Sequence, residues 1–192
     1  MAQKLVILSD MWGAKKGLYI TSYLGYLQQY FDITYYDIQQ LANIDVKVLT
    51  QDNVHRAFVE GGIDTAVAHL LKKETEPAHY LGFSVGGTIA WKAGLMGLPM
   101  KSLYTVSSTR IRAEKSKPEC EVTALFGDKD MYRPKLDWHQ EVGVKSDLIS
   151  GFGHTMYNDE KIIGRVCLDL LNAVTQPNKK KKKEVRAHIK IA

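Results

Sequence analysis

Residues 82–86 of the chain, GFSVG, have the types and spacing of a serine nucleophile site. They fit the pattern G-x-S-x-G, in which the serine stands on a tight turn between a strand and a helix. The context agrees, because an apolar run (78–83) precedes Ser84 and a helix-like segment (86–96) follows it. The amino end of a helix presents unpaired N–H groups, which favour negative charge on a reacting oxygen. The pattern predicts that Ser84 attacks an acyl carbon, and a plain glycine-rich turn is the other interpretation.

A serine hydroxyl is a weak nucleophile until a base takes its proton, and His154 is the candidate for that base. It ends the segment GFGH (151–154), directly after the last strand-like run (144–149). Glycines at this point allow the loop to turn back over the edge of a sheet. A structural histidine is the alternative interpretation. The other histidines lie in expected helices, at a strand start or near the carboxyl terminus: His55, His69, His79, His139 and His188.

The base needs a carboxylate that orients it, and the segment LFGDKD (125–130) offers two. This segment lies at the end of another strand-like run, 121–126. We expect Asp130 to be the acid. Asp128 remains the alternative, although an aspartate in such a turn also hydrogen-bonds the nearby backbone.

An alternation of strand-like and helix-like segments accounts for most of the chain before residue 175. The strand-like runs are 4–8, 32–38, 78–83, 101–106, 121–126 and 144–149. The helix-like segments are 18–30, 52–73 with a break at 61–62, 86–96, 134–142 with Pro134 in its first turn, and 161–174. This alternation predicts an α/β fold with a parallel sheet and helices on both faces. The polar connection 107–120 is expected to hold only a short helix or a loop.

In order and placement, the three motifs resemble those of the α/β-hydrolase family. GFSVGG is similar to its nucleophile turn, LFGDKD to its acid loop and GFGH to its histidine loop, in the family's chain order Ser84, Asp130, His154. The resemblance covers roughly residues 4–174. It implies a three-layer sandwich with about six mostly parallel strands in the order 2-1-3-4-5-6, without the family's first two antiparallel strands.

The resemblance also implies where an oxyanion would be held. In the family, one N–H belongs to the residue after the nucleophile and another to the loop after the first parallel strand. These positions correspond to Val85 and Met11, with Trp12 as a neighbouring alternative. The common His-Gly pair of that loop is replaced by Ser9-Asp10. Asp10 would lie too close to an oxyanion unless its side chain turns away or accepts a local hydrogen bond.

The connection 107–120 is too short for the lid domain that many family members insert there, so an open site is expected. Trp12, Met131 and Met156 adjoin the expected site loops and are candidates for an acyl pocket, since binding pockets are mostly apolar. Core packing is the other interpretation of these side chains. Basic residues in 107–120 suit an acidic substrate or an acyl-carrier partner, or form a solvated loop.

The chain has 192 residues, 45% of them hydrophobic, and two cysteines. These values fit one domain over 1–175 that buries its core without disulfides. No cluster of metal-ligating residues is visible, so no metal or other cofactor is expected. Because no apolar run reaches about 20 residues and MAQKLVILSD does not read as a signal peptide, we expect a cytoplasmic protein without a transmembrane segment.

The carboxyl-terminal residues, 176–192, form a basic tail. Seven Lys and Arg residues and one Glu give the tail a net charge of +6, and the overall +5 leaves −1 for the rest of the chain. We expect a flexible, solvated tail, with weak contact to anionic surfaces as the alternative. No aromatic residue stands among the lysines to stack on bases, so no specific nucleic-acid partner is expected.

These expectations converge on a serine hydrolase that cleaves a carboxylic ester or thioester of a small-molecule substrate through an acyl-enzyme intermediate. The alternative is a binding or interaction protein that keeps the α/β-hydrolase fold with weak or no catalysis. The Ser9-Asp10 departure favours this alternative, and the order of Ser84, Asp130 and His154 favours the enzyme.

Overall fold

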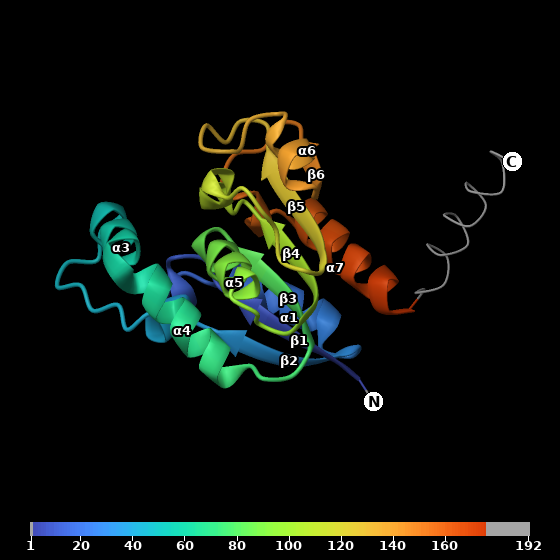
Figure 1. Cartoon of the computed structure of the whole chain (residues 1–192), viewed down its shortest axis with the longest axis horizontal. Helices are drawn as coiled ribbons and strands as arrows, with labels where there is room; N and C mark the ends of the chain where they lie inside the picture. The colour runs from blue at the N-terminus through green and yellow to red at the C-terminus, as the bar shows by residue number, and fades with distance from the viewer. Residues whose placement is uncertain (1, 176–192) are drawn as a thin grey trace, which may run out of the picture.

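A single parallel sheet forms the centre of the computed structural model, which describes residues 2–175 (Figure 1). Its strands are β1 (Gln3–Leu8), β2 (Phe31–Tyr36), β3 (Ala78–Phe83), β4 (Met100–Val106), β5 (Glu121–Gly127) and β6 (Lys145–Ile149). They lie in the order β2-β1-β3-β4-β5-β6, and every neighbouring pair is parallel. The strand order expected from the sequence is confirmed. The carboxyl ends of all six strands therefore meet at one edge of the sheet.

Side chains alternate along each strand, and this alternation separates two apolar layers. In β1, Leu5 and Ile7 face one layer, whereas Val6 and Leu8 face the other. All four are completely buried. Strands buried on both faces explain why the sequence shows continuous apolar runs here instead of a polar–apolar alternation.

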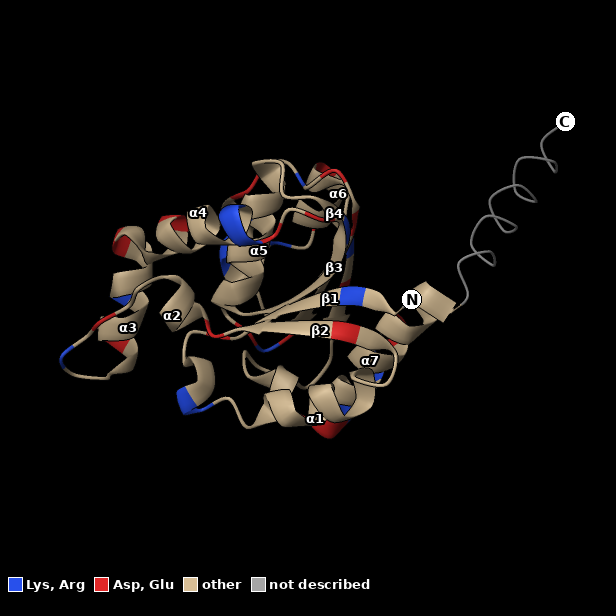
Figure 2. Ribbon diagram, turned by 90° about the horizontal axis from the view of Figure 1, so that it is seen from below, with Lys and Arg blue, Asp and Glu red and all other residues tan. Residues whose placement is uncertain are grey.

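Helices cover both faces, as Figure 2 shows from the edge of the sheet. One face is covered by α1 (Tyr19–Leu27) and α7 (Glu160–Thr175). The opposite face is covered by α4 (Ile63–Lys73) and α5 (Val85–Leu95), together with the shorter α2 (Ile38–Leu41), α3 (Gln51–Ala57) and α6 (Trp138–Val142). This is the three-layer arrangement that the sequence predicts.

The connections differ from expectation at two places and agree with it at a third. The helix expected over 134–142 begins only at Trp138, because the Arg133 side chain donates to the carbonyls of Asp128 and Pro134 and holds this stretch as turns. The break expected at 61–62 within the segment 52–73 is present, in the wide turn η2 (Phe58–Gly62), where Gly61 has φ 141°. The short helices η1 (Gly13–Lys15) and α2 have too few residues to show a periodicity in the sequence.

The connection after β4 holds only the short helix η3 (Thr109–Ala113), as expected for 107–120. A last short helix, η4 (Met156–Asn158), leads from the loop after β6 into α7. The expected tail, 176–192, lies outside the described residues. Over residues 2–175, no helix is both long enough and apolar enough to cross a membrane.

Candidate active site

Ser84 occupies a strained turn between β3 and α5. Its backbone has φ 50° and ψ −122°, a conformation that costs a non-glycine residue on the order of 1–3 kcal/mol. The Ser84 N–H donates to the Val106 carbonyl at 2.9 Å, which ties the turn to β4. A Cβ on Gly82 would lie 2.4 Å from the Gly87 Cα. The turn can therefore close only because glycine flanks the serine.

His154 lies beside this serine, on the loop that follows β6. Its Nε2 is 2.9 Å from the Ser84 Oγ. The loop rests on the end of β5, because a Cβ on Gly127 would lie 2.1 Å from the Phe152 carbonyl oxygen. The Lys129 N–H donates to the same oxygen at 2.9 Å. Backbone contacts between two strand ends thus bring the imidazole to the serine.

Asp130 lies on the other side of the imidazole. Its Oδ2 is 2.7 Å from the His154 Nδ1, and its Oδ1 accepts the Tyr132 N–H at 3.0 Å. Only 3% of Asp130 is exposed, so water competes little for this carboxylate. The three side chains expected from the sequence therefore form one continuous hydrogen-bonded row.

Asp128, the alternative acid, has a different environment. Its Oδ1 accepts the Gly151 N–H at 2.8 Å, and its Oδ2 accepts the Ser150 hydroxyl at 3.1 Å. The structure places this carboxylate against the turn that leads to His154 and places Asp130 against the imidazole itself. Asp128 supports the loop from outside the hydrogen-bonded row.

The loop after β1, residues 9–12, which we call the β1 loop, lies against the start of α5. A Cβ on Gly86 would be 2.1 Å from the Ser9 carbonyl oxygen. Val85, the first residue of α5, directly follows Ser84, and its N–H lies in the first turn, where a helix offers no acceptor. The close approach at Gly86 brings the β1 loop to this same turn.

Met11 carries an N–H that is unpaired among residues 2–175. At the other end of the same peptide group, the Asp10 carbonyl oxygen accepts the Gly13 N–H at 3.1 Å and the Ser9 hydroxyl at 3.0 Å. A peptide group is planar, so bonds that fix its oxygen also fix the direction of its N–H.

In the peptide group between Met11 and Trp12, both the carbonyl oxygen and the N–H are hydrogen-bonded. The Trp12 N–H donates to the Asp10 Oδ1 at 3.1 Å, and the Met11 carbonyl accepts the Gln39 side-chain amide at 2.7 Å. The backbone N–H of Trp12, the alternative donor expected from the sequence, is therefore already engaged. The contribution of Gln39 has no sequence signal, because α2 brings this residue to the loop from 28 positions away.

Asp10 is buried, with 4% of its surface exposed. Its Oδ2 accepts the Tyr157 hydroxyl at 3.0 Å. Burial raises the pKa of the Asp10 carboxyl, while hydrogen bonds from Tyr157 and Trp12 and the charge of His154 act in the opposite direction. Of the two arrangements that the sequence left open for this residue, the side chain adopts the one with local hydrogen bonds.

The three apolar side chains expected to line an acyl pocket differ in exposure. Met131 is 82% exposed beside the acid, and Trp12 is half-buried with the Lys16 ammonium 3.8 Å from its ring centre. Met156 is only 3% exposed and packs among core side chains of the α1–α7 layer. Of the two interpretations that the sequence left open for Met156, an acyl pocket and core packing, this burial favours core packing.

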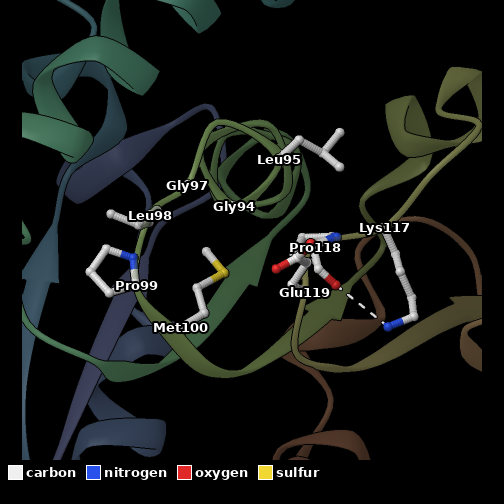
Figure 3. Close-up of a pocket in the computed structure, with 9 residues that line it drawn as sticks. All are labelled: Gly94, Leu95, Gly97, Leu98, Pro99, Met100, Lys117, Pro118 and Glu119. Atoms are coloured by element: carbon white, nitrogen blue, oxygen red, sulfur yellow. Dashed lines mark hydrogen bonds between the residues drawn. The ribbon is translucent and has the colours of Figure 1, made fainter.

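A cavity of about 510 Å³ lies at the opposite edge of the sheet, between the end of α5 and the start of β4 (Figure 3). Its lining includes Gly94, Leu98, Met100 and Lys117. The Lys117 ammonium donates to the carbonyls of Pro118 and Cys120, so it is already engaged. No serine or histidine lines this cavity, which separates it from the row at Ser84. Within residues 2–175, no three metal-ligating side chains gather to hold an ion.

Solved structures of low sequence identity share this architecture. An inferred hydrolase of the alpha/beta superfamily from Xanthomonas campestris is 15% identical, with a TM-score of 0.65 over 90% of this chain and 99% of that chain. Alpha/beta hydrolase domain-containing protein 10 from mouse is 11% identical, with a TM-score of 0.60 over 91% of this chain and 90% of that chain. Est1E from Butyrivibrio proteoclasticus, with ferulic acid bound, is 14% identical, with a TM-score of 0.60 over 91% of each chain. No family model and no curated protein matches the sequence.

Proposed function

We propose that this chain, which has the α/β-hydrolase fold, is a serine hydrolase that cleaves a carboxylic ester or thioester. The observation that carries the proposal is the row of hydrogen bonds from the Ser84 Oγ through His154 to the Asp130 Oδ2, at 2.9 and 2.7 Å. A nucleophile within hydrogen-bond reach of a base, which a third group orients, is the arrangement that acyl transfer requires.

The reaction proceeds in two halves. His154 takes the proton of the Ser84 hydroxyl as its oxygen attacks the acyl carbon, and then gives that proton to the departing alcohol or thiol. This leaves the acyl group esterified to Ser84. Water then attacks the acyl-enzyme, with His154 again as the base, and releases the carboxylic acid. Asp130 keeps the proton on Nδ1, so that Nε2 faces the serine.

The developing oxyanion is held by the N–H groups of Val85 and Met11. The Val85 N–H belongs to the first turn of α5, where unpaired donors and the helix dipole favour negative charge. The Met11 N–H has no partner among residues 2–175 and is held in direction by the bonds to the Asp10 carbonyl. Donors that are fixed before the reaction lower the barrier most, because they need no reorganisation.

The second candidate function is a binding protein of the same fold with little catalysis. One observation favours it: the Asp10 carboxylate is buried in the β1 loop, and a charge there opposes a second negative charge nearby. Its hydrogen bonds to Trp12 and Tyr157 disperse that charge, so we favour the enzyme.

Labelling with a fluorophosphonate probe tests the proposal. The native chain should be labelled, and Ser84→Ala should not. Ser116→Ala, which changes an exposed serine in the loop before β5, is the matched control and should be labelled like the native chain. Hydrolysis of p-nitrophenyl butyrate should follow the same pattern. Labelling and turnover that persist in Ser84→Ala would refute the assignment.

A further inference from the structure

The β1 loop is held from within by the side chain of Asp10. Two peptide groups flank Met11, and three of their four polar groups are hydrogen-bonded; the fourth, the Met11 N–H, has no partner in the described part of the chain. Asp10 supplies the acceptor for the Trp12 N–H, at 3.1 Å. The conformation of the loop at the free N–H therefore depends on where the Asp10 carboxylate is held.

That carboxylate is anchored from outside the loop by Tyr157. The Tyr157 hydroxyl donates to the Asp10 Oδ2 at 3.0 Å, across 147 residues of chain. The backbone of Tyr157 is fixed in turn, because the Tyr23 hydroxyl on α1 donates to its carbonyl at 3.2 Å. Tyr157 is 3% exposed, so this anchor is shielded from water.

The ring of Tyr157 also lies against the residue before the nucleophile and against the base itself. Its centre is 5.6 Å from that of Phe83, the residue before Ser84, and 6.4 Å from that of the His154 imidazole. One side chain thus contacts the strand that carries the nucleophile, the base and the β1 loop.

We propose that Asp10 and Tyr157 form a clasp that positions the β1 loop, so that the Met11 N–H stays aimed at the oxyanion formed at Ser84. Both are positioning residues, since neither hydrogen-bonds Ser84 or His154. The inference rests on the proposed hydrolase function. It gives a role to Asp10, which stands in the Ser9-Asp10 pair that departs from the family's common His-Gly pair. The Asp10 carboxylate binds the β1 loop to the part of the chain that carries the base.

Steady-state kinetics of four variants with p-nitrophenyl butyrate test the clasp. Asp10→Ala removes both acceptors and should lower kcat by about 10- to 100-fold with KM within about twofold, since the loss concerns an interaction made in the transition state. Tyr157→Phe should lower kcat by a smaller factor. The double variant should be no slower than Asp10→Ala, within about twofold, because both changes break one clasp.

Asp10→Asn is the conservative rescue. Its amide oxygen still accepts the Trp12 N–H, and its NH₂ donates to the Tyr157 hydroxyl after that hydroxyl rotates. It should retain kcat within about fivefold of the native value. Tyr104→Phe is the matched control, because its hydroxyl donates to the Asp169 Oδ2 at 2.8 Å, away from Ser84. Loss of that bond should leave kcat unchanged.

Each outcome is decisive. Native kcat in both Asp10→Ala and Tyr157→Phe overturns the clasp but leaves the proposed function standing, provided that turnover still depends on Ser84. A rise in KM at constant kcat also overturns it. So does a double variant whose kcat is lowered by the product of the factors measured in the two single variants. If Asp10→Ala does not fold, Tyr157→Phe against Tyr104→Phe gives the answer. Native turnover that Ser84→Ala does not abolish overturns the proposed function, and the clasp with it.

Discussion

The Asp130 Oδ2 lies 2.7 Å from the His154 Nδ1, whereas the carboxylate of Asp128 accepts the Gly151 N–H at 2.8 Å. Two acids separated by one residue thus contact the same loop at different points. One contact is to the ring of the base and the other is to the backbone that carries it.

This difference predicts unequal effects for two matched substitutions. Asp130→Asn should lower kcat by roughly 10⁴-fold, because an amide that donates to the imidazole holds the wrong tautomer. Asp128→Asn keeps an oxygen for the Gly151 N–H and should lower kcat by less than about tenfold. Both are measured at saturating p-nitrophenyl butyrate. A larger loss in Asp128→Asn than in Asp130→Asn would reverse the two assignments.

The strained turn at Ser84 predicts that glycine at this position gives a more stable chain than alanine does. Glycine adopts φ 50° without steric cost, whereas alanine keeps the strain of the native serine. Relief of about 1–3 kcal/mol, reduced by the greater entropy of glycine in the unfolded chain, should leave Ser84→Gly about 1 kcal/mol more stable than Ser84→Ala. Urea unfolding measures the difference, and neither variant should hydrolyse esters. Equal or lower stability of Ser84→Gly would show that the turn stores no strain.

The crowding at Gly86 predicts that replacing this glycine lowers both stability and activity. In Gly86→Ala the new Cβ would lie 2.1 Å from the Ser9 carbonyl oxygen, so either α5 or the β1 loop must shift. We expect a loss of about 1–3 kcal/mol in the free energy of unfolding, together with a lower kcat.

Gly164→Ala is the control for this change. Gly164 is exposed on α7 with no atom within 4 Å of an added Cβ, and the substitution should stabilise the chain by up to about 1 kcal/mol. Thermal or urea unfolding of both variants checks the pair. An unchanged stability in Gly86→Ala would mean that the contact with Ser9 is looser than the structure has it.

The sheet and the turn at Ser84 are predictable because their signals are local. Residues 78–96 hold a strand, a glycine-flanked serine and a helix in one uninterrupted stretch. Parallel strands then bring their carboxyl ends to one edge, which places the segments around Asp130 and His154 near Ser84.

Contacts between segments that are far apart in the sequence cannot be predicted from local sequence patterns. Asp128 and Asp130 follow the same strand, and only the loop some 20 residues further on distinguishes them. The late start of α6 depends on side-chain bonds from Arg133 to backbone carbonyls, which no periodicity records. Likewise, Met156 adjoins the histidine in the sequence, but η4 turns it into the core.

The buried carboxylate of Asp10 predicts a pH-dependent cost to stability. Burial raises its folded-state pKa above the usual 3.8, with Tyr157, Trp12 and His154 acting in the opposite direction. A group with a raised pKa contributes its full stability below the unfolded-state pKa and loses it as the pH rises through the folded-state pKa. As the pH rises above 3.8, the raised folded-state pKa of Asp10 therefore costs stability, and Asp10→Asn does not carry this cost. The variant should unfold at higher urea than the native chain at pH 7, and the difference should shrink as the pH approaches 3.8. Urea titrations at several pH values measure this, and a variant that is less stable than the native chain at pH 7 would show that the hydrogen bonds of the carboxylate outweigh its desolvation.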